Sequence, residues 1–177
     1  MPIPKTRLVF DNSPLSHFAR AGLLDVLERI VTEYICVSPA EVITEIFNGA
    51  SEYPALAKVL TEPWIQVVEN LDVRELVAFA HYKRELGGGP DRNNGEAAVL
   101  AWTKINGGVA IIDERAGTRI AQRENIEVHG TLSLVLNGTL ERVEAETVVD
   151  QLKATGMILP VDGAGLFAWA YQEGILP

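Results

Sequence analysis

The chain has little of several features that would place it in other protein classes. Its 177 residues include one cysteine, which excludes an internal disulfide, and three histidines, which lack the spacing of zinc ligands. No apolar run approaches the roughly 18 residues that a membrane span needs. The N-terminal stretch MPIPKTRLVFD has no signal-peptide core. We therefore expect a cytoplasmic protein that makes no contact with a membrane.

Basic residues are also in short supply. The formal net charge is −9 at pH 7, which argues against a protein that coats nucleic acid with a generally basic surface. It does not exclude a nuclease, because bound divalent cations would compensate clustered carboxylates and a local basic stripe could hold phosphates.

The hydrophobic and charged fractions, 47% and 22%, are those of a folded protein, and the length suits one compact domain over residues 1–177. Runs rich in branched residues alternate with helical patterns, which predicts an α/β fold with a mainly parallel sheet. The expected strands are Arg7–Phe10, Tyr34–Val37, Trp64–Val68, Val109–Ile112 and Ile126–Val128. The expected helices lie near 14–30, 39–49, 71–86, 95–105 and 115–124, with more helix after Gly130.

Two helix starts are indicated by a serine followed by a proline. Ser13 precedes Pro14, and Ser38 precedes Pro39, which predicts a serine cap with proline in the first turn. Ser38 and Glu41 also match the S-x-x-E capping box. Cys36 lies in the apolar run YICV, where a buried strand position is favoured over a reactive thiol.

Two acids directly follow predicted strands. Asp11 comes after LVF and Asp113 after VAII. Ligands of open α/β sheets collect at the carboxyl ends of the strands, so these acids could converge. For either acid alone, a solvated turn residue or a helix cap is the simpler interpretation.

Two further acids belong to predicted helices. Glu45 borders the apolar stripe of the 39–49 helix, whereas Glu41 is expected to point away and serve the capping box. Glu96 begins GEAAVLAW, where a first-turn acid also gains from the helix dipole. Four acids in one pocket would repel one another without a cation, and hard carboxylate oxygens suit Mg²⁺ or Mn²⁺.

Four sequence blocks together resemble the PIN-domain family, in the branch of predicted nucleic-acid-binding proteins that contains VapC-like toxins. They are VFDNSPLSHFARAGLLDVL, SPAEVITEI, GEAAVLAW and VAIIDERAGTRIAQRENIEVHGTLSLV. Their order is the family's order, from about residue 7 to 136. The family's acids fall on Asp11, Glu45, Glu96 and Asp113, and its Gly-Thr pair on Gly130–Thr131.

This resemblance implies a three-layer α/β/α fold with a core of about 7–136. The mostly helical pattern after Gly130 predicts a helical C-terminal extension of about 139–177. It implies a metal-dependent ribonuclease that leaves 5′-phosphate and 3′-hydroxyl ends, with RNA as substrate. A cognate antitoxin and a homodimer are the candidate protein partners. Asn12 departs from the family pattern, since Thr or Ser is usual beside the first acid, and Glu96 replaces the commoner aspartate.

The residue roles follow from that resemblance. We expect Asp11, Glu96 and Asp113 to bind Mg²⁺ or Mn²⁺, and Glu45 to act through water or to orient the nucleophile. Asn12 and Ser13 are candidates for hydrogen bonding to these carboxylates without binding the metal themselves, although Ser13 is more typical of a helix cap.

A basic stripe is expected directly after Asp113. Arg115, Arg119 and Arg123 recur at every fourth residue, so they share one helix face. Arginine's planar fork suits phosphate oxygens, which favours Arg115 and Arg119 as phosphate-binding residues. The alternative is a solvated face, and for Arg123 the two interpretations are equally favoured.

Two other functions remain open. One is a non-catalytic PIN module that binds RNA or protein, against which the retention of all four acids argues. The other is phosphatase chemistry of the haloacid-dehalogenase type, which also has an aspartate after the first strand. That chemistry usually needs a second acid two residues later, where this chain has Ser13.

Overall fold

A parallel sheet forms the centre of the protein, which a computed structural model describes over residues 5–69 and 72–177. The sheet has five strands in the order β3-β2-β1-β4-β5, and every neighbouring pair is parallel. The strands are β1 (Arg7–Phe10), β2 (Ile35–Pro39), β3 (Ile65–Val68), β4 (Val109–Ile111) and β5 (Val128–His129).

The two central strands are the most apolar. Leu8, Val9 and Phe10 of β1 and all three residues of β4 are buried, as expected for parallel strands covered on both faces. Cys36 lies buried in β2, and burial raises the pKa of its thiol to about 12, so an inert core position is confirmed. The predicted strands are found: β1 has the predicted ends, and the ends of the other four strands differ from the prediction by at most two residues.

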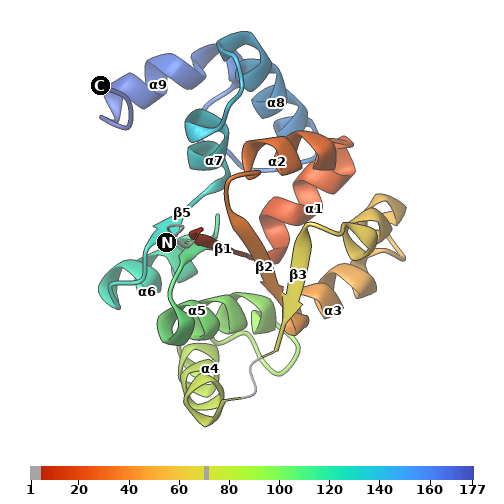
Figure 1. The fold of residues 1–177 in the computed structure, drawn as a ribbon, viewed down its shortest axis with the longest axis vertical. Helices are drawn as coiled ribbons and strands as arrows, with labels where there is room; N and C mark the ends of the chain where they lie inside the picture. The colour runs from red at the N-terminus through yellow and green to blue at the C-terminus, as the bar shows by residue number, and fades with distance from the viewer. Residues whose placement is uncertain (1–4, 70–71) are drawn as a thin grey trace.

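Helices cover both faces of the sheet, so the predicted α/β/α arrangement is confirmed (Figure 1). In Figure 1, α5 and α4 lie below the sheet, and α1, α2, α7 and α8 lie above it. The helices before β4 are α1 (Asn12–Ala21), α2 (Leu24–Ile30), α3 (Ala40–Gly49), the 3-10 helix η1 (Pro54–Thr61), α4 (Val73–Leu86) and α5 (Asn94–Asn106). After β4 come α6 (Arg115–Arg123), α7 (Thr131–Asn137), α8 (Arg142–Ala154), the short 3-10 helix η2 (Gly163–Gly165) and α9 (Leu166–Gln172).

Two predictions about helices need correction or comment, and one helix was not expected. The single helix expected over 14–30 is two helices, because Gly22 adopts a left-handed conformation with φ 73° and ends α1. The 3-10 helix η1 was not predicted. The predicted start of a helix at residue 71 lies outside the described residues, and α4 is described from Val73, with an Asp72 capping box.

Both serine caps are wrong. Asp11 takes the cap position of α1, which places Ser13 inside the first turn. Ser38 is a buried residue of β2, and its hydroxyl donates to the Phe10 carbonyl at 3.1 Å, so it ties two strands together. Glu41 therefore has no capping box, and its Oε2 is buried without a hydrogen-bond partner among the described residues.

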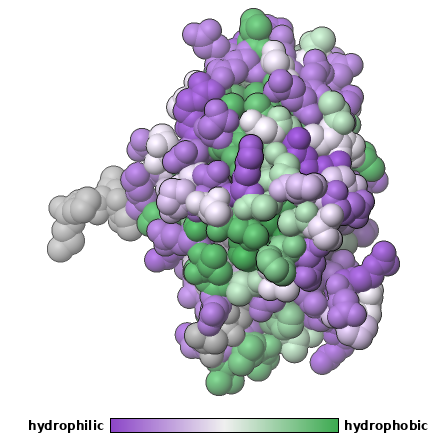
Figure 2. All heavy atoms as spheres, turned by 90° about the vertical axis from the view of Figure 1, so that its right-hand side faces the viewer, coloured by the Kyte–Doolittle hydropathy of each residue, from purple (hydrophilic) through white to green (hydrophobic). Residues whose placement is uncertain are grey.

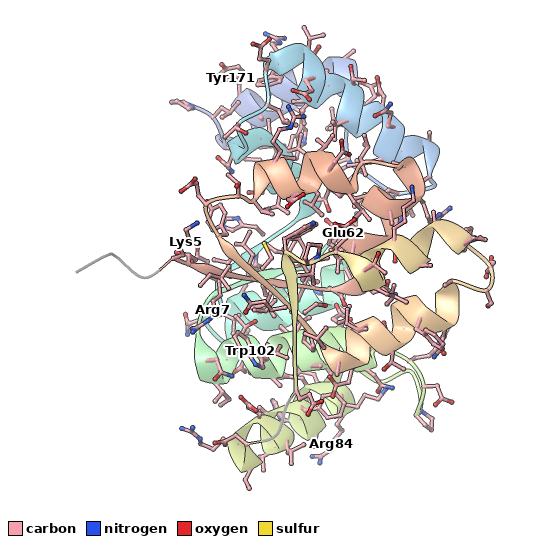
Figure 3. All side chains as sticks on the ribbon, turned by 45° about the vertical axis from the view of Figure 1, so that its right-hand side comes forward. Lys5, Arg7, Glu62, Arg84, Trp102 and Tyr171 are labelled. Carbon is pink, nitrogen blue, oxygen red and sulfur yellow. The ribbon has the colours of Figure 1, made fainter. Side chains whose placement is uncertain are left out.

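The C-terminal helices belong to the packed structure. Val149, Leu152 and Leu166 are fully buried in the same hydrophobic core as the sheet. Helix α8 packs against α1 and α7, while α9 and Tyr171 lie at the end of the molecule farthest from α4 (Figure 3). At the other side of the sheet, the Arg7 guanidinium lies 6.0 Å from the Trp102 ring centroid and joins β1 to α5 (Figure 3).

The outer surface is mixed. Figure 2 shows hydrophobic residues reaching the surface in the middle of one face and at its lower end, where α4 lies. Val73 and Val77 of α4 and Val67 of β3 are among the exposed residues. Across the described ranges, no helix has the length and apolar character needed to cross a membrane.

Candidate active site

Asp11 and Asp113 lie at the carboxyl ends of neighbouring strands. Phe10 of β1 is paired with Ile111 of β4, and the Asp11 backbone N–H donates to the Ile111 carbonyl at 3.1 Å. Asp11 is buried, with 5% of its surface exposed, so it is not a solvated turn residue. Its side chain does not cap α1 either, although it occupies the cap position.

Glu45 and Glu96 reach the same region from two helices that pack together, α3 and α5. The Gly95 backbone N–H donates to Glu45 Oε1 at 2.8 Å, which joins the two helices directly beside Glu96. Glu96 is 5% exposed, and its Oε1 accepts the Gly117 backbone N–H from α6 at 2.9 Å. Glu96 is thus a buried acid in the first turn of α5, and a hydrogen bond from α6 holds its carboxylate in place.

Three of the four predicted acids line one pocket of about 240 Å³. Its lining residues are Asp11, Asn12, Ser13, Ser16, His17, Glu45, Asn93, Glu96 and Glu114. Asp113 lines a larger adjoining pocket of about 580 Å³, which shares Ser13, His17 and Glu114 with the first. The four acids are therefore distributed over two adjoining hollows at the same edge of the sheet.

Asp113 is engaged differently from the other acids. Its Oδ1 accepts the Thr131 backbone N–H at 2.8 Å, and its Oδ2 accepts the Thr131 hydroxyl at 2.8 Å. Asp113 therefore holds the first residue of α7 against the end of β4. Each carboxylate oxygen keeps a second lone pair, so these bonds orient Asp113 without using up its capacity as an acceptor.

Three glycines make room for three of the carboxylates. A Cβ on Gly95 would lie 2.9 Å from Glu45 Oε2, and one on Gly130 would lie 3.0 Å from Asp113 Oδ1. A Cβ on Gly117 would overlap the Glu96 carboxylate, whose Cδ would be only 2.8 Å away. None of these glycines has a positive φ, so they serve close approach of a carboxylate and not a left-handed turn.

The electrostatics of the acids agree with their closeness. Burial, with the charges of Glu96, Glu45 and Asp113, raises the pKa of Asp11 well above its ordinary value. Burial, with repulsion from Glu114 and Glu45, raises the pKa of Glu96 to about 7. Burial raises the pKa of Asp113 as well, opposed by the two hydrogen bonds from Thr131 and reinforced by Glu114. Removing protons from this group of acids is costly unless a cation is nearby.

Glu114 and His17 are pocket residues that the sequence did not single out. Glu114 lines both hollows and raises the pKa of two of the predicted acids. The only signal for it was its place beside Asp113 after a strand. His17 is half-buried and lines both hollows, whereas His81 and His129 are exposed.

Asn12 and Ser13 are both at the pocket. The Asn12 amide nitrogen lies 3.4 Å from Glu45 Oε2, and its carbonyl oxygen accepts the Ser16 hydroxyl at 2.5 Å. Asn12 is thereby held in the orientation in which it donates to Glu45. A threonine or serine could not offer an acceptor and an NH₂ donor in this way.

The carboxylate oxygens suit a hard divalent cation, although the acids are not arranged to surround one completely. No three His, Cys, Asp or Glu side chains in the described ranges form a ready metal-binding group. The pocket nevertheless offers carboxylate oxygens from three elements, and burial and nearby negative charges raise the pKa values of Asp11 and Glu96. Mg²⁺ retains several waters and needs few protein ligands, so it fits an open arrangement of this kind.

The comparison with protein families decides the identity of the fold. The family model described as PIN domain matches residues 7–163, most of the chain. The chain belongs to the PIN-domain family. PIN domains are in general nucleases and typically use divalent metal ions, which agrees with acids gathered at the sheet edge. The search of curated proteins found no match.

The PIN-domain match runs past the expected core boundary at residue 136 and includes α8. That extent agrees with the packing of α8 on α1, the helix that begins directly after Asp11. The C-terminal part therefore borders the acidic region and is not remote from it.

The three arginines of α6 have different surroundings. Arg115 lines the larger hollow beside Asp113. The Arg119 Nε donates to the Arg115 carbonyl at 3.3 Å, one turn farther along the exposed face. Arg123 pairs with Glu85 of α4 and Glu124, so its guanidinium is engaged in ion pairs on the surface.

Proposed function

We propose that this PIN domain is a Mg²⁺- or Mn²⁺-dependent endoribonuclease that hydrolyses RNA phosphodiesters. The observation that carries the proposal is the pocket in which Asp11, Glu45 and Glu96 meet from three separate elements. Burial and mutual repulsion raise the pKa values of two of these acids, and nothing in the packing of a fold requires such an arrangement.

The proposed metal-binding residues are Asp11, Glu96 and Asp113, with Glu114 added because it faces both hollows. A bound divalent ion lowers the pKa of water and stabilises negative charge on phosphoryl oxygens. Gly117 and Thr131 hold Glu96 and Asp113 in place through hydrogen bonds. These fixed carboxylates would not need to reorganise when a cation binds.

Glu45 is the proposed orienting residue. Its Oε1 is held by the Gly95 N–H and its Oε2 lies near the Asn12 amide, so its carboxylate is fixed at the pocket wall. From there it can accept a proton of the attacking water. The water oxygen bonds to phosphorus, the bond from phosphorus to the 3′-oxygen breaks, and that oxygen takes up a proton. The products are 5′-phosphate and 3′-hydroxyl ends.

Arg115 and Arg119 are the proposed phosphate-binding residues. Arg115 lies in the hollow next to Asp113, and Arg119 follows on the same helix face. A local cationic stripe would offset the repulsion between RNA and a chain of net charge −9.

The decisive test uses purified protein and end-labelled RNA. We expect cleavage with Mg²⁺ or Mn²⁺, none with excess EDTA, and a loss of more than roughly 100-fold in kcat for Asp11→Asn. Circular dichroism and melting curves show whether the variant is folded. Cleavage that survives in a folded Asp11→Asn protein would remove the assignment. RNA binding without any cleavage would favour the non-catalytic PIN module instead.

We propose that the protein is the toxin of a toxin-antitoxin pair, acting in the cytoplasm, with a small antitoxin encoded beside it. The support is the resemblance of the sequence blocks to VapC-like toxins. Inducible expression should arrest growth, and co-expression of the neighbouring reading frame should restore it. Light scattering on the purified protein tests the expected homodimer.

A further inference from the structure

The larger hollow beside the acidic pocket has the features of a binding site in its own right. Its volume is about 580 Å³, within the range of roughly 300–1,000 Å³ typical of small-molecule sites. It adjoins the acidic pocket, since Ser13, His17 and Glu114 line both. Any RNA with a phosphate at the acids must continue into a neighbouring space, and this hollow, which Asp113 itself lines, adjoins them.

One wall of the hollow is apolar and comes from the segment Gly156–Pro160, which follows α8. Met157 is buried and anchors the segment, whereas Ile158 is 97% exposed. A single exposed isoleucine is ordinary on a protein surface. Here it lines a hollow to which Asp113 and Arg115 also contribute, so the site offers both apolar and charged side chains.

The apolar wall is fixed in position. The Thr155 hydroxyl donates its only proton to the Leu152 carbonyl at 2.6 Å, so it accepts the hydrogen bond from His17 Nδ1 at 2.5 Å. This bond ties the start of the segment to α1. Beyond the segment, Asp150 of α8 accepts the Gly163 N–H at 2.7 Å. The segment, which lines the same hollow as Arg115, is therefore held at both ends.

We propose that this hollow is a nucleotide subsite, in which Ile158 contacts the base adjoining the scissile phosphate and Arg115 contacts the neighbouring phosphate. The inference rests on the proposed ribonuclease function and names a specificity-determining residue for it. The lining residues include no phenylalanine, tyrosine or tryptophan, and the one imidazole, that of His17, is hydrogen-bonded to Thr155, so Ile158 offers the base an aliphatic contact. A purine covers more apolar surface than a pyrimidine, and the site should therefore favour purines at this position.

The test compares Ile158→Ser with Val143→Ser, a matched change at a residue of α8 that is 73% exposed and does not line the hollow. Both are surface substitutions that should leave the fold intact. The first measurement is fluorescence anisotropy of a labelled random RNA hexanucleotide with a Glu96→Gln background that slows cleavage. Ile158→Ser should weaken binding roughly five- to tenfold, and Val143→Ser should not change it.

The second measurement is cleavage of an RNA library by proteins with Glu96 intact. Ile158→Ser should raise KM several-fold, leave kcat within about twofold and flatten the purine preference beside the cut. Unchanged binding and base preference would overturn the subsite while wild-type cleavage kept the nuclease assignment. Equal losses in both serine variants would also overturn it. If the wild type cut no RNA but Ile158→Ser alone lost binding, the nuclease assignment would fail and the nucleotide site would stand.

Discussion

At the scale of single residues, three of the four acids are held by a backbone group that another element provides. Gly95 donates to Glu45, Gly117 donates to Glu96, and the Thr131 N–H donates to Asp113. Neutral N–H donors orient a carboxylate but do not cancel its charge. The acids therefore stay mutually repulsive, and the site stores an unfavourable free energy that a cation can relieve.

The raised pKa of Glu96 predicts a pH-dependent stability in metal-free buffer. Its folded-state pKa of about 7 exceeds the ordinary value of 4.5, so the folded protein binds the proton more tightly. Stability should therefore fall as the pH rises from 4.5 through 7, by up to roughly 3 kcal/mol. Glu96→Gln keeps an oxygen that accepts the Gly117 N–H. Because glutamine does not ionise, the variant does not lose stability as the pH rises, and it should be more stable than the wild type at pH 8.

Urea unfolding of both proteins with EDTA at pH 5 and pH 8 measures this effect. The advantage of Glu96→Gln should be large at pH 8 and nearly absent at pH 5. Glu75→Gln is the control, because Glu75 is also buried but lies outside the pocket, where it bonds to the Asp72 N–H and Asn106. If the difference in free energy of unfolding between Glu96→Gln and the wild type were the same at pH 5 and pH 8, the expected proton linkage would be contradicted.

Gly117 offers a second test at the residue scale. Gly117→Ala would place a methyl group on the Glu96 carboxylate, so that acid must leave its position. We expect kcat to fall at least roughly tenfold with a modest loss of stability, because the carboxylate is misplaced but not removed. Gly49→Ala is the matched helical control, since its Cβ would meet only the flexible Leu56 side chain. Full activity in Gly117→Ala would show that the position of Glu96 is unimportant.

At the scale of elements, α6 separates its arginines into two roles. Arg123 joins α6 to α4 through Glu85, whereas Arg115 lies at the hollow beside the acids. Helical spacing alone puts all three arginines on one face. The sequence left Arg123 undecided, and its ion pairs now favour the structural interpretation.

This division predicts how RNA affinity responds to salt. Replacing Arg115 and Arg119 together by alanine should weaken binding and reduce the slope of log Kd against log salt by about 1 to 2. Arg123→Ala should leave the slope unchanged and cost little stability, because its ion pairs are exposed. The measurement is a salt titration by anisotropy in the presence of metal. Equal slopes for all three proteins would leave Arg115 and Arg119 as surface arginines.

At the scale of the whole molecule, the site lies where the parallel sheet, α3, α5 and α6 meet. Binding of a divalent ion there should stabilise the fold, because the ion binds the native arrangement and not the separated acids of the unfolded chain. With free Mn²⁺ at about 100 times its Kd, the gain is roughly 2.7 kcal/mol, or about 5 to 10 °C in Tm.

Thermal melts with and without Mn²⁺, at matched ionic strength, check this expectation. Asp11→Asn should melt normally in EDTA and lose most of the Mn²⁺ effect. A Tm that Mn²⁺ leaves unchanged, together with no heat of binding in calorimetry, would count against a metal site.

The sequence by itself determined the fold class, the family and the elements that carry the acids. Apolar runs of strand length alternating with amphipathic helices leave few alternatives to a covered parallel sheet. Because parallel strands end at one edge, acids placed after β1 and β4 had to lie near each other.

Only the tertiary structure decided which acid faces which hollow. The pattern after β4 offers Asp113 and Glu114 as neighbours, and the chain fold turns Asp113 toward Thr131 and leaves Glu114 at both hollows. Likewise, Ser38 fits a capping box by sequence, but its hydroxyl donates to the Phe10 carbonyl on the adjacent strand. The physical reason is common to both. Periodicity shows which way a side chain points from its own element, whereas its partner comes from a distant part of the chain that only packing brings near.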